Sequence, residues 1–404
     1  MSKRLVYICD WLPPDFGAVG QYAVLFAREW AGEGWDVTLV GLTSGPTNHS
    51  EAEHFGPGTV ETIRVCRPTY EKKKLASRLW WTIVSNVLLL RTAFGSIRRA
   101  ETVLFTGSPP LMLHFIAPLN LLVRKRLIYR ITDFHPECLI AERGRTSRLL
   151  GLMLRLTHFW RRRVDQFEVL GCDQARRLID SGISENKIRL KRDPSPVSFA
   201  QGLTPLPLPE KLHSAPGIIL YSGNWGVAHD DSTFAEGYAR YVSESTTPLS
   251  LWLNATGAKA DRVEQALASQ GLPVHRSKLV PLDDVPRLLL AADLHLVTLR
   301  DAFVGYVLPS KVHACIQSGK RILFIGDGSS DVHLLASAAL PADKYHRVDV
   351  GDVAGLTNVL HRIERDIINE RKSGMAALES KGDTKKNRSS GKLLFGEKSG
   401  EAPC

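Results

Sequence analysis

FVGYVLPSKVHACIQSGKRILFIG, residues 303–326, is the stretch that decides the fold. It predicts a loop, a short helix, a turn and a buried strand, in that order. Pro309 suits the first turn of a helix, where its missing N–H costs nothing, and Gly319 suits the left-handed position just past the helix end. Residues 321–326 then form an apolar strand. A helix followed at once by a buried strand indicates an α/β domain.

The start of this helix carries residue types that bind phosphate. A helix that begins at Pro309–Ser310 directs unpaired N–H groups and the positive end of its dipole toward the preceding loop. Lys311 adds a point charge in the same turn. The segment therefore predicts a bound anion, although an ordinary helix with a solvated lysine accounts for these residues equally well.

Length and charge indicate a two-domain protein with a cationic region in its N-terminal half. A chain of 404 residues with 44% hydrophobic residues is long enough for two domains with sizeable cores. The net charge is +10, but residues 71–163 alone hold 18 lysines and arginines against five acidic residues, a net +13. Such a region suits anionic lipid, phosphorylated substrates or nucleic acid. No nucleic-acid recognition motif accompanies the charge, so we expect no nucleic-acid partner.

Cysteine usage and the N-terminus favour the cytoplasm. The six cysteines, at positions 9, 66, 138, 172, 315 and 404, include no Cys-x-x-Cys pair, which argues against a zinc site and a disulfide scaffold. The sequence MSKRLVYICDW lacks the long apolar run of a signal peptide and enters a strand almost at once.

Residues 1–195 predict a Rossmann-like domain. A strand at 4–9, a Pro/Gly loop, a helix at 21–31 and a strand at 36–41 form a βαβ opening. Further strands are predicted at 103–106, 127–132, 166–170 and 187–190, and their alternation with helical stretches implies a mostly parallel sheet.

Gly17 and Gly20 stand in the loop after the first predicted strand. They would let the backbone approach a ligand at the carboxyl end of the sheet, where open parallel sheets bind ligands. Their spacing is not the G-x-G-x-x-G fingerprint of dinucleotide binding, and two glycines equally serve a tight turn.

A cationic, apolar stretch in this half suggests contact with a membrane surface. LASRLWWTIVSNVLLLRTAFG, residues 75–95, is uninterrupted by charge only from Leu79 to Leu90, which is too short to span a bilayer. Lysines at 72–74 precede it and Arg98 and Arg99 follow it, so the helix could lie in a membrane interface. Residues 111–127 could extend that surface. A buried core helix with charged ends is the alternative.

YRITDFHPECLIAERG, residues 129–144, places titratable side chains just past a predicted strand. Pro136 keeps the loop from being helical, and Asp133, His135 and Glu137 crowd into it. Polar groups there belong to a cleft more often than to a core. His135 is a candidate base or orienting group, and Asp133 or Glu137 a carboxylate near the reacting centre. A turn cap at Asp133 and a surface histidine at 135 are the plainer alternative.

A linker and a second α/β domain follow. Residues 196–216 are Pro-rich and predict a linker, and residues 217–371 predict the second domain. We expect residues 372–404, rich in Gly, Ser and Lys, to be a disordered tail. Strands are predicted at 217–222, 249–254, 278–281 and 293–298, and helices at 260–269, 285–292 and 355–371.

The turn after the first strand of the second domain has residue types that suit phosphate. Gly223 and Gly226 flank Asn224 between a predicted strand and a helix, where backbone amides can cradle an anion. Two glycines in a turn are by themselves weak evidence.

Together, these motifs resemble the retaining glycosyltransferases of family 4, which share the GT-B fold of two Rossmann-like domains facing across a cleft. The resemblance runs from PPDFGAVGQY through TDFHPE and VDQFEVLGCDQARRLIDSGISENKIRL to YSGNWGVAHDD, AADLHLVTLRD and LPSKVHACIQSGKRIL. It is strongest toward the bacterial branch that builds colanic acid, O-antigen, lipopolysaccharide and other exopolysaccharides or capsules.

The resemblance implies a metal-independent hexosyltransferase without a cofactor. Its C-terminal domain would bind a nucleotide-diphosphate sugar and its N-terminal domain a glycan acceptor, often linked to a polyprenyl diphosphate. The enzyme would then be peripheral at the inner face of the cytoplasmic membrane, which agrees with the cationic stretch. By position, the donor-binding residues would be Gly17, Gly20, Gly223, Asn224, Gly226, His229, Ser310 and Lys311, and His135 would lie near the transferred sugar.

The chain departs from the family at three donor contacts. Two glutamates separated by seven residues are usual in the family, and their places here hold Tyr306 and Ala314. His229 stands at or near the place of the lysine that commonly follows the phosphate loop. Since some members of the surface-polysaccharide branch lack the glutamate pair and keep Pro-Ser-Lys, we expect altered donor contacts and not loss of activity.

Two other functions stay open at this point. A sugar-nucleotide epimerase can have the same fold, since fold does not fix function. A catalytically silent subunit of a polysaccharide assembly complex would explain Tyr306 and Ala314, and it predicts weak or absent donor binding.

Overall fold

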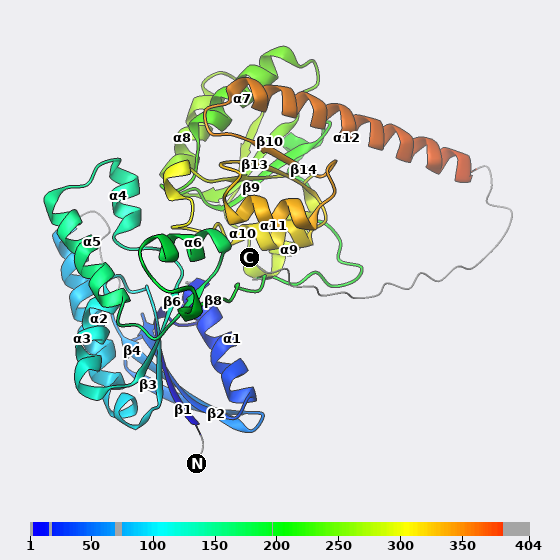
Figure 1. Cartoon of the computed structure of the whole chain (residues 1–404). Coiled ribbons are helices and arrows are strands. Elements are labelled where there is room, and N and C mark those ends of the chain that lie inside the picture. Colours follow the sequence, from blue (N-terminus) through cyan, green and yellow to red (C-terminus); the bar gives the residue numbers. More distant parts are fainter. Residues whose placement is uncertain (1–2, 16–17, 69–74, 196, 383–404) are drawn as a thin grey trace. The chain divides into compact units, whose positions relative to one another are not determined.

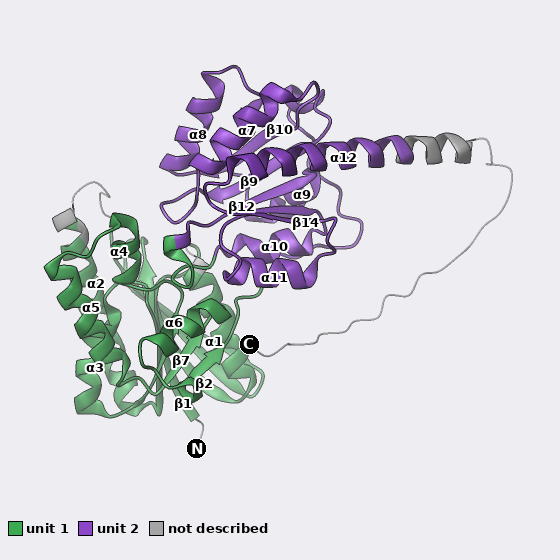
Figure 2. Cartoon of the chain, turned by 45° about the horizontal axis from the view of Figure 1, so that its top comes forward, with its two compact units in different colours: residues 1–194, 302–308 green, residues 195–301, 309–404 purple. Residues whose placement is uncertain are grey.

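The computed structural model describes residues 3–15, 18–68, 75–195 and 197–382. The chain divides into two compact units, and Figure 2 colours them separately. Unit 1 comprises residues 1–194 and 302–308, and unit 2 comprises residues 195–301 and 309–404. Both units are α/β, as the sequence predicts. The predicted linker, 196–216, is counted within unit 2.

Unit 1 is built on an eight-stranded sheet in the order β3-β4-β2-β1-β5-β6-β7-β8. All neighbouring pairs are parallel except β3–β4, which is an antiparallel hairpin at one edge. The strands are β1 Lys3–Trp11, β2 Trp35–Thr43, β3 His49–Phe55, β4 Gly58–Cys66, β5 Thr102–Thr106, β6 Arg126–Ile131, β7 Gln166–Val169 and β8 Ile188–Leu190.

Helices cover both faces of this sheet because alternate side chains of its strands are apolar. In β1, Leu5 and Tyr7 pack in one buried cluster with α1, and Val6 and Ile8 pack in another with α2 and α3. Figure 1 shows α1 apart from the group α2, α3 and α5. The helices are α1 Ala18–Gly32, α2 Leu75–Arg99, α3 Met112–Val123, α4 Glu137–Arg143, α5 Arg148–Arg161 and α6 Cys172–Asp180.

Unit 2 repeats the plan with a six-stranded parallel sheet in the order β11-β10-β9-β12-β13-β14. Helices α7, α8 and α12 share one buried cluster with the sheet, and α10 and α11 lie on the opposite side of it in Figures 1 and 2. The strands are β9 Ile218–Asn224, β10 Ser250–Thr256, β11 Val274–Arg276, β12 Leu294–Thr298, β13 Arg321–Ile325 and β14 Tyr345–Val348. The helices are α7 Ser232–Glu244, α8 Ala258–Ala268, α9 Val285–Ala291, α10 Lys311–Gln317, α11 Asp331–Ala339 and α12 Val353–Gly382.

The segment 303–326 folds as predicted. Helix α10 begins just after Pro309–Ser310, Gly319 has a φ of +65°, and β13 follows two residues later. The strand predicted at 278–281 is wrong, because the strand that pairs with β10 lies at Val274–Arg276. The C-terminal helix also continues beyond residue 371 to Gly382, since Ala, Leu, Glu and Lys there favour helix. The remainder of the predicted tail, 383–404, lies outside the described residues.

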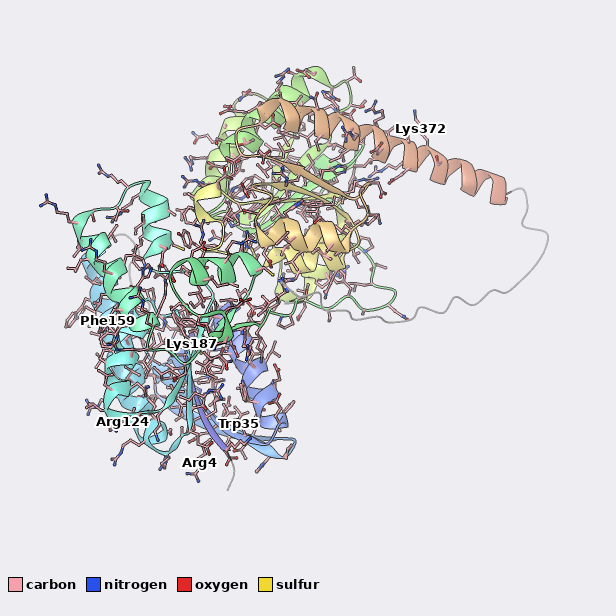
Figure 3. All side chains as sticks on the ribbon, in the orientation of Figure 1. Arg4, Trp35, Arg124, Phe159, Lys187 and Lys372 are labelled. Atoms are coloured by element: carbon pink, nitrogen blue, oxygen red, sulfur yellow. The ribbon has the colours of Figure 1, made fainter. Side chains whose placement is uncertain are left out.

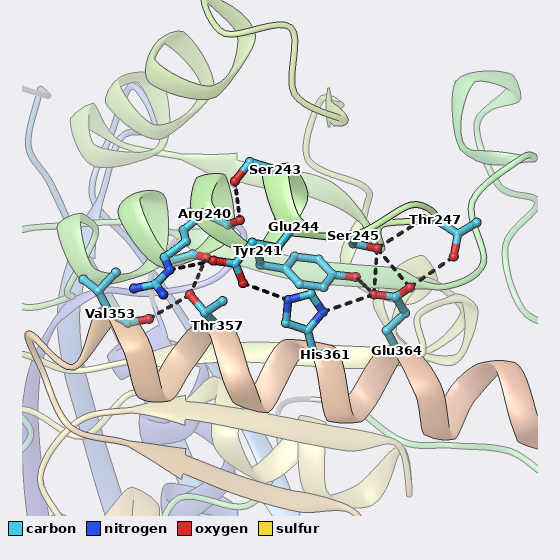
Figure 4. Close-up of polar contacts among 11 residues, drawn as sticks. Arg240, Tyr241, Ser243, Glu244, Ser245, Thr247, Val353, Thr357, His361 and Glu364 are labelled. Atoms are coloured by element: carbon cyan, nitrogen blue, oxygen red, sulfur yellow. Dashed lines mark hydrogen bonds and ion pairs between the residues drawn. The ribbon is translucent and has the colours of Figure 1, made fainter.

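A polar network attaches α12 to α7 (Figure 4). The Glu364 carboxylate accepts hydrogen bonds from the hydroxyls of Tyr241 (2.7 Å), Ser245 (2.9 and 3.0 Å) and Thr247 (3.1 Å). His361, one turn earlier, approaches Glu244 at 3.3 Å. Because Glu364 is only 9% exposed, these hydroxyls replace the water that it loses on burial.

Arg130 is enclosed in unit 1 and holds three segments together. Its guanidinium donates to Glu168 on β7 (2.9 Å), to Asp193 (2.7 Å) and to the Lys191 carbonyl (3.1 Å). The side chain is 2% exposed and also lies 4.2 Å from the ring centroid of Phe26. Asp193 is one residue before the end of the first segment of unit 1, so Arg130 fixes the place where the chain leaves this unit.

Within the described part of the chain, every helix is too short or too polar to cross a bilayer.

Replacing Arg130 by Met should destabilise the protein by about 3–5 kcal/mol, because the carboxylates of Glu168 and Asp193 would stay buried without their partner. Urea unfolding followed by circular dichroism measures the change. Arg126→Met, an exposed position on the same strand, is the matched control and should unfold close to the wild type. Equal midpoints for the two variants would contradict the role given to Arg130.

Candidate functional site

Unit 2 has a fixed loop at the carboxyl end of its central strand. Trp225 directly follows β9 and is fully buried. Its ring stacks on Tyr221 with centroids 3.8 Å apart, and its indole N–H donates to the Asp230 carbonyl at 2.9 Å. Its backbone N–H donates to Thr256 at 2.7 Å. The loop from 224 to 230 is therefore held from within, and its polar groups have defined positions.

The structure brings the predicted turn residues together with one glycine that the sequence analysis missed. Gly223 has a φ of +102°, and Asn224 is exposed beside Gly226. Gly257 also has a positive φ, and a Cβ there would lie 2.6 Å from Asn224 Oδ1 and 2.7 Å from the Trp225 carbonyl. No side chain can occupy that place, so Gly257 keeps the turn clear.

Lys311 has a buried amine beside this loop. Its Nζ lies 3.4 Å from the ring centroid of Tyr221 and has no hydrogen-bond partner among the described residues. Burial lowers the pKa of Lys311 to about 7. A buried amine without a partner is costly unless an anion balances it. Ser310, the preceding residue, is exposed at the start of α10.

His229 is a neutral group in this site and does not replace a lysine. Its Nδ1 lies 2.6 Å from the Thr298 carbonyl, which can only accept, so Nδ1 carries the proton and Nε2 is the free acceptor. Burial, together with the charges of Lys311 and Lys259, lowers the pKa of His229 to about 3. A second cation nearby is Lys259, whose Nζ lies 2.8 Å from Asp231 and donates to the His229 carbonyl. Sequence reasoning missed Lys259, because it follows the loop of another strand.

These groups gather where the strand order of unit 2 changes direction. From β9, the chain adds β10 and β11 on one side of the sheet and β12, β13 and β14 on the other. Loops after β9 and β12 therefore leave toward opposite faces, which opens the sheet edge to ligands. His229 follows β9 and bonds to the end of β12, and Lys311 lies in the connection after β12.

Unit 1 has a polar cluster at the corresponding place between β1 and β5. Asp10 near the end of β1 accepts a hydrogen bond from the Ser108 hydroxyl after β5 through Oδ2. Its Oδ1 is buried without a partner among the described residues, and burial raises the pKa of Asp10. Gly107, which precedes Ser108, lies close to the loop after β6. A Cβ on it would be 3.4 Å from the Asp133 carbonyl oxygen. Asp10 and Ser108 are 98 positions apart, and only an aspartate at a strand end could have signalled this pair in the sequence.

The loop after β6 gives its three predicted catalytic residues different surroundings. Asp133 is exposed and His135 is half-buried. Glu137 is buried at the start of α4, and both of its oxygens accept hydrogen bonds from Arg161. Burial alone would raise the pKa of Glu137, but hydrogen bonds from His158 and Arg161 outweigh it and lower this pKa to about 2. Glu137 is thus engaged in holding the loop, and a role for it near the reacting centre stays a prediction.

Gly20 also has a different surrounding from the expected one. It belongs to the first turns of α1, and a Cβ there would lie 1.7 Å from the Trp11 carbonyl. The glycine is needed for close packing of α1 on β1, and its approach to a ligand stays a prediction. Gly17 lies outside the described residues.

The two positions of the family's glutamates belong to different units. Tyr306 is in the 302–308 segment of unit 1, where its carbonyl accepts from the Phe134 N–H at 3.1 Å and its ring lies 4.6 Å from the Arg177 guanidinium carbon. Arg177 also donates twice to the Val304 carbonyl, at 3.0 and 3.1 Å. Ala314 is buried on α10 in unit 2. Neither side chain offers a carboxylate to a donor ribose.

In the described part of the chain, no three His, Cys, Asp or Glu side chains are grouped as a metal site would require. The expected metal independence stays a prediction.

The sequence matches no family model, and no curated protein matches it. Solved structures do match. An α,α-trehalose-phosphate synthase (UDP-forming) from Burkholderia xenovorans has a TM-score of 0.57 at 12% identity over 93% of this chain and 100% of that one. A lipopolysaccharide outer core galactosyltransferase gives 0.51 at 11% identity over 90% and 91%. A Listeria monocytogenes protein assigned as a UDP-N-acetylglucosamine 2-epimerase gives 0.51 at 11% identity over 91% and 91%.

At these identities, the likeness shows the fold. The chain has the GT-B architecture, with two α/β units that are each built on a largely parallel sheet.

The Glu137–Arg161 pair should make the protein sensitive to acid. Because folding lowers the pKa of Glu137 from 4.5 to about 2, the pair stabilises above pH 4.5 and loses its effect as pH falls toward 2. The loss is roughly 3 kcal/mol. In urea unfolding at several pH values, Glu137→Gln should be destabilised at neutral pH, and its difference from the wild type should shrink below pH 4.5 and nearly vanish near pH 2. The control is Glu142→Gln, an exposed position just after it on α4, which should follow the wild type at every pH.

Proposed function

We propose that this protein is a glycosyltransferase that moves a sugar from a nucleotide-diphosphate sugar to a glycan acceptor. The observation that carries the proposal is the buried, unpartnered amine of Lys311 at the carboxyl edge of the unit 2 sheet. A diphosphate is the ligand that such a group suits, because two negative charges offset the cost of burying the ammonium. The GT-B fold supports this reading, since similar structures include a UDP-forming synthase and a galactosyltransferase.

The donor would be held by charge from lysines and by polar groups of the fixed loop. Lys311 would contact the diphosphate, with Ser310 and the 223–226 turn beside it. As the bond from the anomeric carbon to the diphosphate breaks, negative charge grows on the leaving oxygens, and a cation already in place stabilises it. The neutral His229 would accept a hydrogen bond from a donor hydroxyl through Nε2 and would not bind phosphate as a cation.

The acceptor would bind to unit 1 through the polar cluster at β1, β5 and β6. The acceptor hydroxyl forms the new bond to the anomeric carbon, and its proton leaves to the departing phosphate oxygen or to solvent. Glu137 is paired with Arg161, so Asp10 and Asp133 are the carboxylates of this cluster that could contact the acceptor. From the family resemblance, we further propose retention of configuration and a polyprenyl-linked acceptor in surface-polysaccharide synthesis, presented at the inner face of the cytoplasmic membrane.

An epimerase is a second candidate, because the match to the Listeria protein is as good as that to the galactosyltransferase. Incubation with UDP-N-acetylglucosamine and no acceptor separates the two functions. A transferase should leave the sugar nucleotide unchanged, whereas an epimerase would convert it. A silent subunit would bind no nucleotide.

Loss of the Lys311 amine should weaken nucleotide binding. Thermal unfolding with UDP, GDP, ADP or TDP should show stabilisation by one nucleotide, by about 2.7 kcal/mol at roughly 100 times its dissociation constant. Lys311→Met should lower the affinity for that nucleotide by about 10- to 100-fold, which corresponds to the loss of one charge-assisted hydrogen bond. Lys211→Met, an exposed lysine of the same unit, should keep the full shift. If no nucleotide stabilises the folded protein, the silent-subunit alternative replaces this proposal.

Nucleotide affinity should also fall as the pH rises above 7. The charged form of Lys311 binds the diphosphate, and its pKa in the free protein is about 7, so binding requires proton uptake at higher pH. Calorimetry between pH 8 and 9, where the diphosphate is almost fully ionised, should show up to a tenfold loss of affinity per unit of pH. Lys311→Met should lack this slope. A wild-type affinity that is constant over the range would mean that the amine does not contact the nucleotide.

A further inference from the structure

Helix α5 presents apolar side chains to solvent. Leu149, Leu152, Leu156 and Phe159 are 75%, 64%, 44% and 44% exposed. Their spacings of three, four and three residues place them along one side of the helix. The opposite side is the one that packs, because Leu150, Thr157 and Arg161 are buried. The helix is therefore amphipathic, with its apolar stripe directed outward.

The charged side chains of α5 and of its flanking residues 143–147 and 162–163 are all positive. Residues 143–163 contain seven arginines and no acidic residue, and only Arg161 among them is buried. At about 100° per residue, Arg148 and Arg155 fall along one edge of the apolar stripe. Arg163 lies 3.6 Å from the ring centroid of Phe159. An apolar stripe edged by arginines is the pattern of a helix that lies in a membrane interface.

Neighbouring helices extend the same side of unit 1. Helix α3 packs on α5, where the hydroxyl of Thr157 lies 3.1 Å from Nε2 of His114. Leu121 and Leu122 at the end of α3 are 57% and 81% exposed, and Arg124 follows them. Figures 1 and 2 both show α2, α3 and α5 side by side, and Figure 3 labels Phe159 and Arg124 on this side.

We propose that the α5 face, defined as Leu149, Leu152, Leu156 and Phe159 with Leu121 and Leu122, docks on an anionic lipid bilayer. The helix lies in the plane of the interface, with its leucines among the acyl chains and its arginines at the lipid phosphates. A bilayer fits better than a protein partner, because lysine- and arginine-rich helices with exposed leucines gain from both apolar burial and anionic headgroups. This inference rests on the proposed function in one respect, since it states where the enzyme would meet a lipid-linked acceptor.

The test is sedimentation of the full chain with vesicles of phosphatidylcholine alone or with about a quarter phosphatidylglycerol. The wild type should bind the anionic vesicles strongly, bind the neutral ones weakly, and be released by salt. Leu149→Ser with Leu152→Ser should lower the partition coefficient about tenfold on anionic vesicles. Arg148→Gln with Arg155→Gln should lower it by about tenfold or more there, with little effect on neutral vesicles.

The matched control is Leu279→Ser with Leu282→Ser. These exposed leucines of unit 2 have the same spacing of three residues, and binding should not change. Equal binding by the Leu149/Leu152 variant and the wild type would overturn the proposal, as would a wild type that ignores anionic vesicles. A face that instead joins two copies of the chain would appear as a dimer in sedimentation velocity without lipid, lost in the same variant, and would also overturn it.

The vesicle-binding test and the nucleotide-binding test can fail independently of each other. Nucleotide stabilisation is measured without lipid, and the α5 variants should retain it in full. Nucleotide binding without vesicle binding would refute only the membrane inference, and vesicle binding without nucleotide binding would refute only the transferase.

Discussion

In each unit, the chain adds strands first on one side of the first strand and then on the other side. The arrangement of the candidate site depends on this reversal of strand order. Parallel strands bring all their carboxyl ends to one edge, but neighbouring connections usually lie on the same face and cover it. The connections after β1 and β5, and those after β9 and β12, lie on opposite faces of their sheets. Asp10 with Ser108, and His229 with Thr298, meet at these two places. Asp10 Oδ1 and Lys311 Nζ, which are buried without a hydrogen-bond partner among the described residues, thus lie in the part of each unit where the topology leaves the edge open.

Groups of this kind are unfavourable for stability, and their surroundings must hold them in place. Burial raises the pKa of Asp10 and lowers that of Lys311 to about 7, so burial disfavours the charged form of both side chains in the free protein. Stabilising contacts lie next to both. Trp225 fixes the loop beside Lys311 through its stacking and two hydrogen bonds, and the Arg161–Glu137 pair fixes the loop after β6. Strained or unpaired groups that persist in an otherwise satisfied structure are characteristic of binding sites.

The charge of the N-terminal half has more than one use. Arg130 and Arg161 are buried and paired with carboxylates, so they hold the fold of unit 1 together. Arg148 and Arg155 on α5 are exposed, and they edge a stripe of leucines with no cover among the described residues. Residue type alone does not separate these roles. The separation follows from which side of a helix meets the sheet.

The sequence by itself determined the α/β class, most strands and helices, the turn at Asn224 and the helix start at Ser310 and Lys311, because these depend on local periodicity and on Pro and Gly. The tertiary structure alone decided that Lys311 is buried over Tyr221, 90 positions away, and that Glu137 is bound by Arg161. It also decided that Gly20 packs against a carbonyl and that the apolar side of α5 faces outward. These features depend on contacts between residues far apart in the chain, and neither spacing nor residue type encodes which side of an element is covered.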